Sequence, residues 1–367
     1  MRRPSILLAT ESLAPGNGGI CRVARLMARV LGAEAAAGRV RLEALAFRDP
    51  MIDPSLNLSG LGCNGSHLRY VLRVQRALWR NTHVIYDMAG MARAHRALRW
   101  FGKPMACWMH GIEIWERART DRISWCRNAD LLLANSNYTR RRAQRLHRGL
   151  DHAKVCWLAT EDDALPGVLP RQPAPNVMIL GRIDSIQKKD MCYKGHESLI
   201  DCWPEVLRAI PEARLTIVGG GSGRSELEQH ARSTPAAGAV DFLGFVPDEA
   251  LPAVFARSSV FAMPSRGEGF GLVYIEAMRH GLPVIASEQD AASEVNLHGI
   301  SGFNVNLDRR EELPNRIIEL LRDPALAMRM GDAGRQRWAE NFRFSAFRDR
   351  FLGILYPWLA GGALHRE

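Results

Sequence analysis

The sequence lacks the cysteine patterns of disulfide frameworks and metal sites. Its seven cysteines are an odd number, and they form no C-x-x-C pair and no cluster with histidine at metal-binding spacing. We therefore expect reduced thiols in a cytoplasmic protein. No Asp-x-Asp triplet occurs either, which argues against a site where a divalent metal bridges a diphosphate.

Long apolar runs are also absent. The first one follows Arg2 and Arg3, but Thr10 and Glu11 interrupt it, so it is too short for the core of a signal peptide. No other stretch approaches the ~20 apolar residues that a membrane-spanning helix needs. We expect a cytoplasmic protein whose contact with the inner face of the cell membrane is at most peripheral.

The composition is that of a globular protein with more than one domain. Apolar residues make up 47% and charged residues 24% of the chain, which excludes disordered and fibrous classes. The 367 residues exceed the usual size of one hydrophobic core, so we expect two domains.

Positive charge is concentrated in the first half of the chain. Residues 1–170 carry a net charge of +12 and the remainder carries −2. Such a field attracts nucleic acid, acidic lipid or phosphorylated acceptors, although arginines that merely solvate helices would give the same count. Two arginine sets are candidate contacts with an anionic membrane surface. The first set is Arg69, Arg73, Arg76 and Arg80, and the apolar residues near it are Val71, Leu72, Leu78 and Trp79. The second set is Arg140, Arg141, Arg142, Arg145 and Arg148.

Two series of short apolar runs alternate with segments of helical period, which predicts two parallel sheets with crossover helices. The strands expected in the first series are 6–10, 42–47, 83–87, 105–110 and 130–136, and those in the second are 177–180, 214–218, 240–243, 259–263 and 283–286. A proline-rich break at 161–176 separates the series. In the first helix, Val23, Leu26, Met27, Val30 and Leu31 share one face, opposite Arg22, Arg25 and Arg29.

The most specific segment runs from Pro264 to Met278 and contains two glutamates, Glu268 and Glu276, with seven residues between them. Three glycines in its turn permit close approach of a ligand to the backbone, and the following helix start suits a diphosphate. The glutamates lie about two helical turns apart, so both can face one cleft. Taken alone, such a pair would favour a structural reading, in which Glu268 caps a helix and Glu276 is a surface acid.

This segment resembles the E-x7-E motif of retaining GT-B glycosyltransferases, family 4 in particular, and the resemblance covers nearly all of the second domain. It implies that Glu268 meets the donor sugar and that Glu276 holds the ribose hydroxyls. Sugar and phosphate would meet the backbone of Gly269, Phe270, Gly271 and Leu272. Arg182 and Lys194 match the family's cations for the leaving diphosphate, and Val246 matches its contact with the base.

The first domain carries two further matches to the family. Gly18 and Gly19 resemble its paired-glycine loop on the donor, and His110 resembles its histidine beside the reacting centre. Glu113 could orient the acceptor, but a surface acid fits equally well. The Gly219 loop is not a dinucleotide fingerprint, since the final glycine of G-x-G-x-x-G would fall on Arg224.

The resemblance thus implies an α/β protein with two Rossmann-like, doubly wound parallel sheets and an interdomain cleft. Residues 1–165 would form the acceptor-side domain, 175–340 the nucleotide-sugar domain, and 341–367 a helix that crosses back. The expected activity is metal-independent, retaining transfer of a hexosyl group from a UDP- or GDP-sugar to a lipid-linked or polysaccharide-precursor hydroxyl. The alternatives are a GT-B epimerase or hydrolase and, less favoured because no nucleic-acid module is visible, a nucleic-acid-binding protein. The polar insertion 183–192 has no assigned role.

Overall fold

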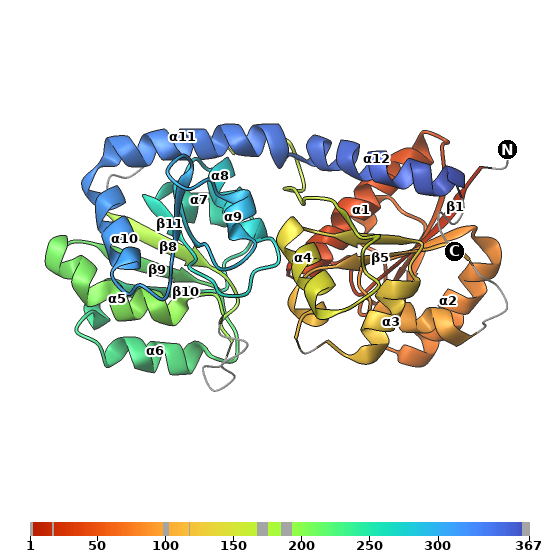
Figure 1. The fold of residues 1–367 in the computed structure, drawn as a ribbon, viewed down its shortest axis with the longest axis horizontal. Helices are drawn as coiled ribbons and strands as arrows, with labels where there is room; N and C mark the ends of the chain where they lie inside the picture. The colour runs from red at the N-terminus through yellow and green to blue at the C-terminus, as the bar shows by residue number, and fades with distance from the viewer. Residues whose placement is uncertain are drawn as a thin grey trace. The chain divides into compact units, whose positions relative to one another are not determined.

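The computed structural model describes residues 3–16, 18–97, 103–116, 118–166, 175–184 and 193–361. The chain divides into two compact units (Figure 1). Unit 1 consists of residues 1–162 together with 344–367, and unit 2 of residues 163–343. Each unit is a parallel sheet with helices on both of its faces.

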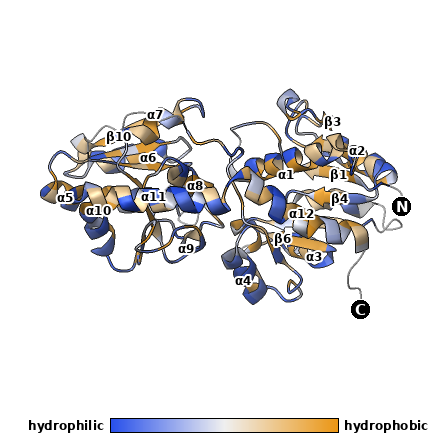
Figure 2. Ribbon diagram, turned by 90° about the horizontal axis from the view of Figure 1, so that it is seen from above, coloured by the Kyte–Doolittle hydropathy of each residue, from blue (hydrophilic) through white to orange (hydrophobic). Residues whose placement is uncertain are grey.

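The sheet of unit 1 has seven strands in the order β3-β2-β1-β4-β5-β6-β7, all paired in parallel. The order reverses direction between β1 and β4, which is the switch point where such sheets bind ligands. The strands are β1 Ser5–Thr10, β2 Arg41–Ala46, β3 Gly60–Gly62, β4 His83–Tyr86, β5 Met105–Met109, β6 Leu131–Ala134 and β7 Lys154–Val155. In Figure 2, β1, β4 and β6 are largely hydrophobic.

Helices cover this sheet. They are α1 Gly19–Ala36, α2 His67–Arg80, α3 Thr120–Asn128, α4 Asn137–Leu146 and α12 Phe344–Gly361, joined by the 3-10 helices η1 Pro54–Leu56, η2 Met91–Ala97 and η3 Ile112–Ile114. The five apolar residues expected on the inner face of α1 are all buried. Helix α12 comes from the end of the chain and packs its Phe347 and Phe351 near Trp108.

The sheet of unit 2 has six parallel strands in the order β10-β9-β8-β11-β12-β13. They are β8 Asn176–Leu180, β9 Arg214–Val218, β10 Val240–Gly244, β11 Val260–Ala262, β12 Val284–Ser287 and β13 Gly302–Val305. The helices are α5 His196–Ala209, α6 Arg224–Arg232, α7 Leu251–Ala256, α8 Leu272–Arg279, α9 Ala292–Val295, α10 Glu312–Arg322 and α11 Pro324–Asn341, with the 3-10 helix η4 Ala237–Ala239 before β10.

Two doubly wound sheets confirm the expected fold class, and a strand lies at each of the ten positions expected from apolar runs. The strands β3, β7 and β13 were not expected, because they are only three, two and four residues long and two of them contain glycine. The cleft between the two sheets stays a prediction. Among the described residues, no helix combines the length and apolar character needed to cross a bilayer.

Candidate functional site

In unit 2, chemically active side chains gather where β8, β11 and β12 end. The loop after β11 runs from Pro264 to Gly271 and leads directly into α8. Gly271 has φ +86°, and a Cβ there would overlap the ring of Tyr274, so only glycine fits this helix start. The first amides of α8 have no preceding turn to bond to, which suits this helix start to an anionic group.

Lys194 and Glu268 form an ion pair at this edge through Nζ and Oε1. Their side chains are only 17% and 12% exposed. Burial disfavours the lysine charge, but Glu268 and Tyr193 outweigh it, so the pKa of Lys194 lies above its usual value. The pair therefore holds a charged lysine beside the glycine turn at neutral pH.

Arg182 lies next to this pair but faces another partner. Its Nε is 3.0 Å from Oδ1 of Asp184, and its side chain is 62% exposed. A Cβ on Gly181 would come within 2.9 Å of Cδ of Lys194, so the lysine stem lies directly over the residue before Arg182. Both cations thus lie at the end of β8, while residues 185–192 of the polar insertion lie outside the described residues.

Asp290, which the sequence analysis did not single out, holds the loop that carries Glu268. Its carboxylate accepts hydrogen bonds from Ser265 Oγ, from the Glu268 amide at 3.0 Å and from the Ala292 amide at 2.9 Å. The amide of Ala291 donates to the Glu268 carbonyl at 3.2 Å. Burial raises the pKa of Asp290 to about 7. Both backbone groups of Glu268 are thereby fixed to the segment after β12.

The other expected donor-binding residues surround this loop or lie at neighbouring strand ends. Glu276 is half-buried on α8, and Phe270 is buried with its ring centroid 5.9 Å from that of Phe342. Val246 is half-buried just after β10, beside a Phe245 that is 75% exposed. The Gly219 loop packs its backbone against Gly181, where a Cβ would overlap the carbonyl of Gly181. Its glycines therefore serve close backbone contact with the β8 end.

In unit 1, His110 directly follows β5 and is held by three hydrogen bonds. Its Nε2 lies 2.6 Å from the Asp87 carbonyl, its amide donates to Glu113 Oε1 at 2.6 Å, and its carbonyl accepts from Asn135 Nδ2 at 2.8 Å. A carbonyl can only accept, so Nε2 carries a proton. Nδ1 has no hydrogen-bond partner within the described part of the chain. Glu113 thus positions the histidine backbone.

Asp87 lies behind His110 at the end of β4 and is fully buried. One carboxylate oxygen accepts from the Glu11 amide at 2.8 Å, and the other, Oδ1, has no partner among the described residues. Burial raises the pKa of Asp87 above its ordinary value. The residue connects the segment after β1 with the ring of His110.

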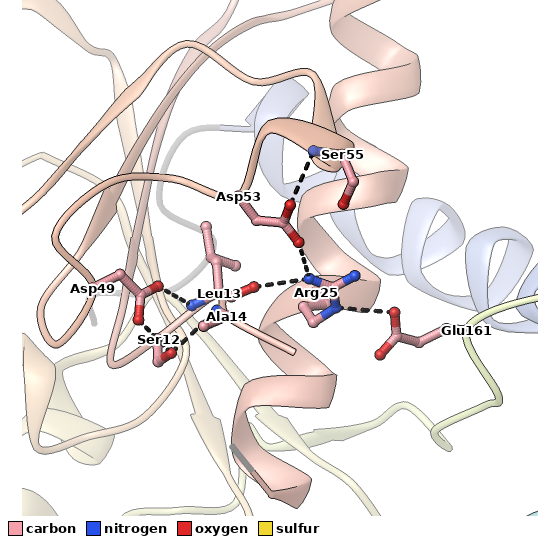
Figure 3. Close-up of polar contacts among 8 residues, drawn as sticks. All are labelled: Ser12, Leu13, Ala14, Arg25, Asp49, Asp53, Ser55 and Glu161. Atoms are coloured by element: carbon pink, nitrogen blue, oxygen red, sulfur yellow. Dashed lines mark hydrogen bonds and ion pairs between the residues drawn. The ribbon is translucent and has the colours of Figure 1, made fainter. Parts of the chain in front are cut away.

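A polar network fixes the segment that leads into the glycine loop (Figure 3). Asp49 accepts from Ser12 Oγ and from the Leu13 amide, both at 2.6 Å. Arg25 donates to the Leu13 carbonyl at 2.9 Å, to Asp53 at 2.7 Å and to Glu161 at 3.0 Å. Arg25, expected on the face of α1 opposite the apolar residues, is thus enclosed by three acceptors.

Gly18 follows this network and precedes α1. It has φ +90°, and nothing lies within 4 Å of where a Cβ would be, so conformation rather than crowding selects glycine. Gly19 is the first residue of α1, which exposes its amide at the helix start. Residue 17 of this loop lies outside the described residues. Among the residues that the structure describes, no group of His, Cys, Asp and Glu could hold a metal ion.

A family model matches a segment that lies mostly in the described part of unit 2. Residues 190–337 match the family model described as glycosyl transferases group 1. A GDP-mannose-dependent alpha-(1-6)-phosphatidylinositol monomannoside mannosyltransferase of Mycolicibacterium smegmatis is 36% identical over 169 residues, which are 44% of each chain. An alpha-D-kanosaminyltransferase of Streptomyces kanamyceticus is 25% identical over 314 residues, 78% of this chain and 80% of its own. The chain thus spans about half the length of the mannosyltransferases that it matches.

Solved structures match both units. Anabaena HepE in complex with UDP and glucose has a TM-score of 0.76 at 21% identity, covering 96% of this chain and 99% of its own. A sucrose-phosphate synthase from Thermosynechococcus elongatus has a TM-score of 0.82 at 22% identity, covering 98% and 99%. At these identities the likeness establishes the fold, which is that of GT-B glycosyltransferases.

Proposed function

We propose that this chain transfers a hexosyl group from a nucleotide-diphospho-sugar to an acceptor hydroxyl, because residues 190–337 match the family model described as glycosyl transferases group 1. Transfer retains the anomeric configuration and needs no metal. The observation that carries the proposal is the Lys194–Glu268 ion pair beside the amides that begin α8. A cation, an acceptor and a helix start are what a diphosphate bonded to a sugar requires.

On the donor side, each group has a distinct task. The ammonium of Lys194 and the guanidinium of Arg182 stabilise charge that grows on the diphosphate as the sugar leaves. Glu268 accepts hydrogen bonds from sugar hydroxyls once the diphosphate has taken over Lys194. Glu276 accepts from the ribose hydroxyls, and the backbone near Val246 meets the base. The acceptor hydroxyl then attacks from the face that the diphosphate leaves.

On the acceptor side, Nδ1 of His110 accepts a hydrogen bond from the donor sugar, since its other ring nitrogen already donates to Asp87. Gly18 and Gly19 offer backbone amides to the same donor. The acceptor hydroxyl belongs to a lipid-linked or polysaccharide-precursor glycan at the cytoplasmic face of the membrane. The relative named for GDP-mannose and a phosphatidylinositol mannoside supports a donor panel that begins with GDP-mannose.

A panel of UDP- and GDP-sugars tests the donor. A ligand that binds only the folded state raises the unfolding temperature, so one nucleotide-sugar should raise it more than the others. The same increase should fall in Glu276→Ala and persist in Glu249→Ala, a control at an exposed position. No increase with any nucleotide-sugar contradicts the proposal.

Product analysis tests the reaction. With the selected donor, proton NMR should show retained configuration and product only when a hydroxyl acceptor is present. Sugar release or epimerised donor without acceptor would instead identify a hydrolase or an epimerase. EDTA should leave the rate unchanged; loss of activity that magnesium or manganese restores would refute metal independence.

A further inference from the structure

Helix α2 has an apolar face toward solvent as well as toward the core. Tyr70, Val74, Ala77 and Leu78 pack into the core of unit 1. Leu68, Leu72 and Trp79 are 70%, 60% and 63% exposed. At ~100° per residue, these three lie within about 40° of one another and opposite the buried face. The side of α2 that faces away from the core would normally be polar. Here it is instead a strip of exposed apolar side chains.

Unpaired positive charge borders this strip on one side. Arg69 and Arg76 are exposed, and neither forms an ion pair with any described residue. Arg73 instead donates to the Gly62 carbonyl, and Arg80 pairs with Glu43 at 2.8 Å. The helix contains no aspartate or glutamate. Of the four arginines expected at a membrane, two are thus available, and the expectation that Leu78 adds exposed apolar area is wrong because it lies in the core.

The second arginine set lacks a neighbouring apolar strip. In α4, Arg142 is bound to Glu116 at 2.6 Å and lies over the ring of Trp115. Arg140 donates to Asn137 at 3.0 Å. The exposed large apolar side chain on α4 is Leu146, at 41%. This helix therefore has charge without an apolar strip beside it.

We propose that the outer face of α2, consisting of Leu68, Arg69, Leu72, Arg76 and Trp79, docks on an anionic lipid bilayer. The apolar side chains enter the boundary between headgroups and acyl chains, and the two arginines bind lipid phosphates. Charge complementarity favours this occupant, because the free cations need anions that α2 does not supply. Three partly exposed side chains also provide only a fraction of the ~800 Å² per partner of a stable protein interface.

Vesicle co-sedimentation tests the docking face without reference to the transferase activity. The purified protein is mixed with phosphatidylcholine vesicles that contain zero or 30 mol % (about one third) phosphatidylglycerol, as a convenient range for surface charge. We expect binding only with phosphatidylglycerol and a decrease as salt rises. Arg69→Gln/Arg76→Gln should weaken binding about tenfold or more, and Leu68→Gln/Leu72→Gln should abolish it at physiological salt.

Two double variants on unit 2 serve as controls, because each removes the same number of arginines or apolar side chains as the corresponding α2 variant. Arg310→Gln/Arg329→Gln removes two exposed arginines, and Ile300→Gln/Met328→Gln removes two apolar side chains that are 57% and 55% exposed. Both should bind like the parent, and all variants should unfold at the parent's temperature. Equal loss in controls and α2 variants, or no binding to phosphatidylglycerol, overturns the proposal. A dimer in sedimentation velocity that Leu68→Gln/Leu72→Gln dissolves would also overturn it and assign the face to a second copy.

Discussion

Lys194 and Glu268 are 74 residues apart in the sequence, yet they form an ion pair that is mostly shielded from water. The pair satisfies both charges while no ligand is bound. A diphosphate can replace Glu268 as the partner of Lys194, which leaves the carboxylate free to accept from sugar hydroxyls. Binding of the donor and rearrangement of the pair are therefore expected to be one event.

Removal of Lys194 should slow the chemical step more than it weakens donor binding. Lys194→Ala takes away a charge that stabilises the leaving diphosphate, an effect of ~3 kcal/mol or about 100-fold in kcat. It also leaves Glu268 buried without its cation, so the unfolding temperature should fall. Steady-state kinetics and thermal unfolding measure the two effects.

The double variant Lys194→Ala/Glu268→Gln separates these roles. It should recover the stability that Lys194→Ala loses, because no buried charge is left unpaired. It should not recover kcat. Recovery of both would show that Lys194 acts only by holding Glu268. Arg266 lies in the same loop as Glu268 and forms an exposed ion pair with Asp308, which follows β13. Arg266→Gln breaks that pair, serves as the control and should leave kcat unchanged.

Asp290 should make stability depend on pH above the usual range of a carboxylate. Its pKa is raised to about 7 by burial, whereas an unfolded aspartate titrates near 4. Between these values the folded state binds more protons than the unfolded state, so the contribution of Asp290 to stability should fall as pH rises from ~4 to ~7 and then level off. Denaturant unfolding gives the unfolding free energy of the parent and of Asp290→Asn at each pH. The difference between these two free energies measures the contribution of Asp290.

The same substitution should lower activity at every pH, because an amide cannot accept from Ser265, Glu268 and Ala292 together, and each lost bond costs ~1–3 kcal/mol. Glu288→Gln, which changes an exposed acid two residues earlier, is the control. If the difference in unfolding free energy between the parent and Asp290→Asn does not change with pH, the raised pKa of Asp290 is refuted.

Ten of the strands could be expected from the sequence because each of these is a local run of apolar residues. The glycine turn could be expected too, because its backbone requirements are local. The role of Asp290 could not, since it depends on contacts with Ser265 and Glu268 from a loop more than twenty residues away. Arg25 shows the same limit. Helical period placed it on the polar face of α1, but Asp53 and Glu161, distant in sequence, bury it.

His110 should act through Nδ1 as a hydrogen-bond acceptor. His110→Ala removes this contact, which costs ~1–3 kcal/mol and should lower kcat/KM by about 5- to 150-fold. His110→Asn keeps an acceptor near the position of Nδ1, whereas His110→Gln extends an amide toward Asp87. We therefore expect more activity in His110→Asn than in His110→Gln. The reverse order in kinetic assays would show that Nε2 carries the function.

Substitutions of Glu113 test the support of the His110 backbone. Glu113→Gln retains an oxygen that can accept from the His110 amide, so its activity should stay within a few-fold of the parent. Glu113→Ala removes the acceptor and should lower kcat/KM, since the His110 backbone loses its support. Equal losses in both variants would mean that the negative charge of Glu113 matters for the acceptor itself.

Arg25 should link the stability of unit 1 to the shape of the glycine loop. Arg25→Met keeps the length of the side chain but leaves Asp53 and Glu161 without their cation and the Leu13 carbonyl without its donor. Because these groups are only partly exposed, we expect a loss of ~1–3 kcal/mol in stability and weaker donor binding through Gly18 and Gly19. Thermal unfolding and donor titration measure the two effects.

Lowering the pH should weaken the same network in the parent protein and reduce its stability. The Arg25 hydrogen bond holds the pKa of Asp53 below its ordinary value, so its contribution is present above pH ~4 and is lost as pH falls through the lowered folded value. Arg25→Met should lose that part of the acid dependence. Arg29→Met is the matched control on α1, where the guanidinium lies 4.4 Å from the ring of Phe344 and has no carboxylate partner among the described residues. Donor binding should be normal in Arg29→Met; if it falls as far as in Arg25→Met, the loop does not depend on the Arg25 network.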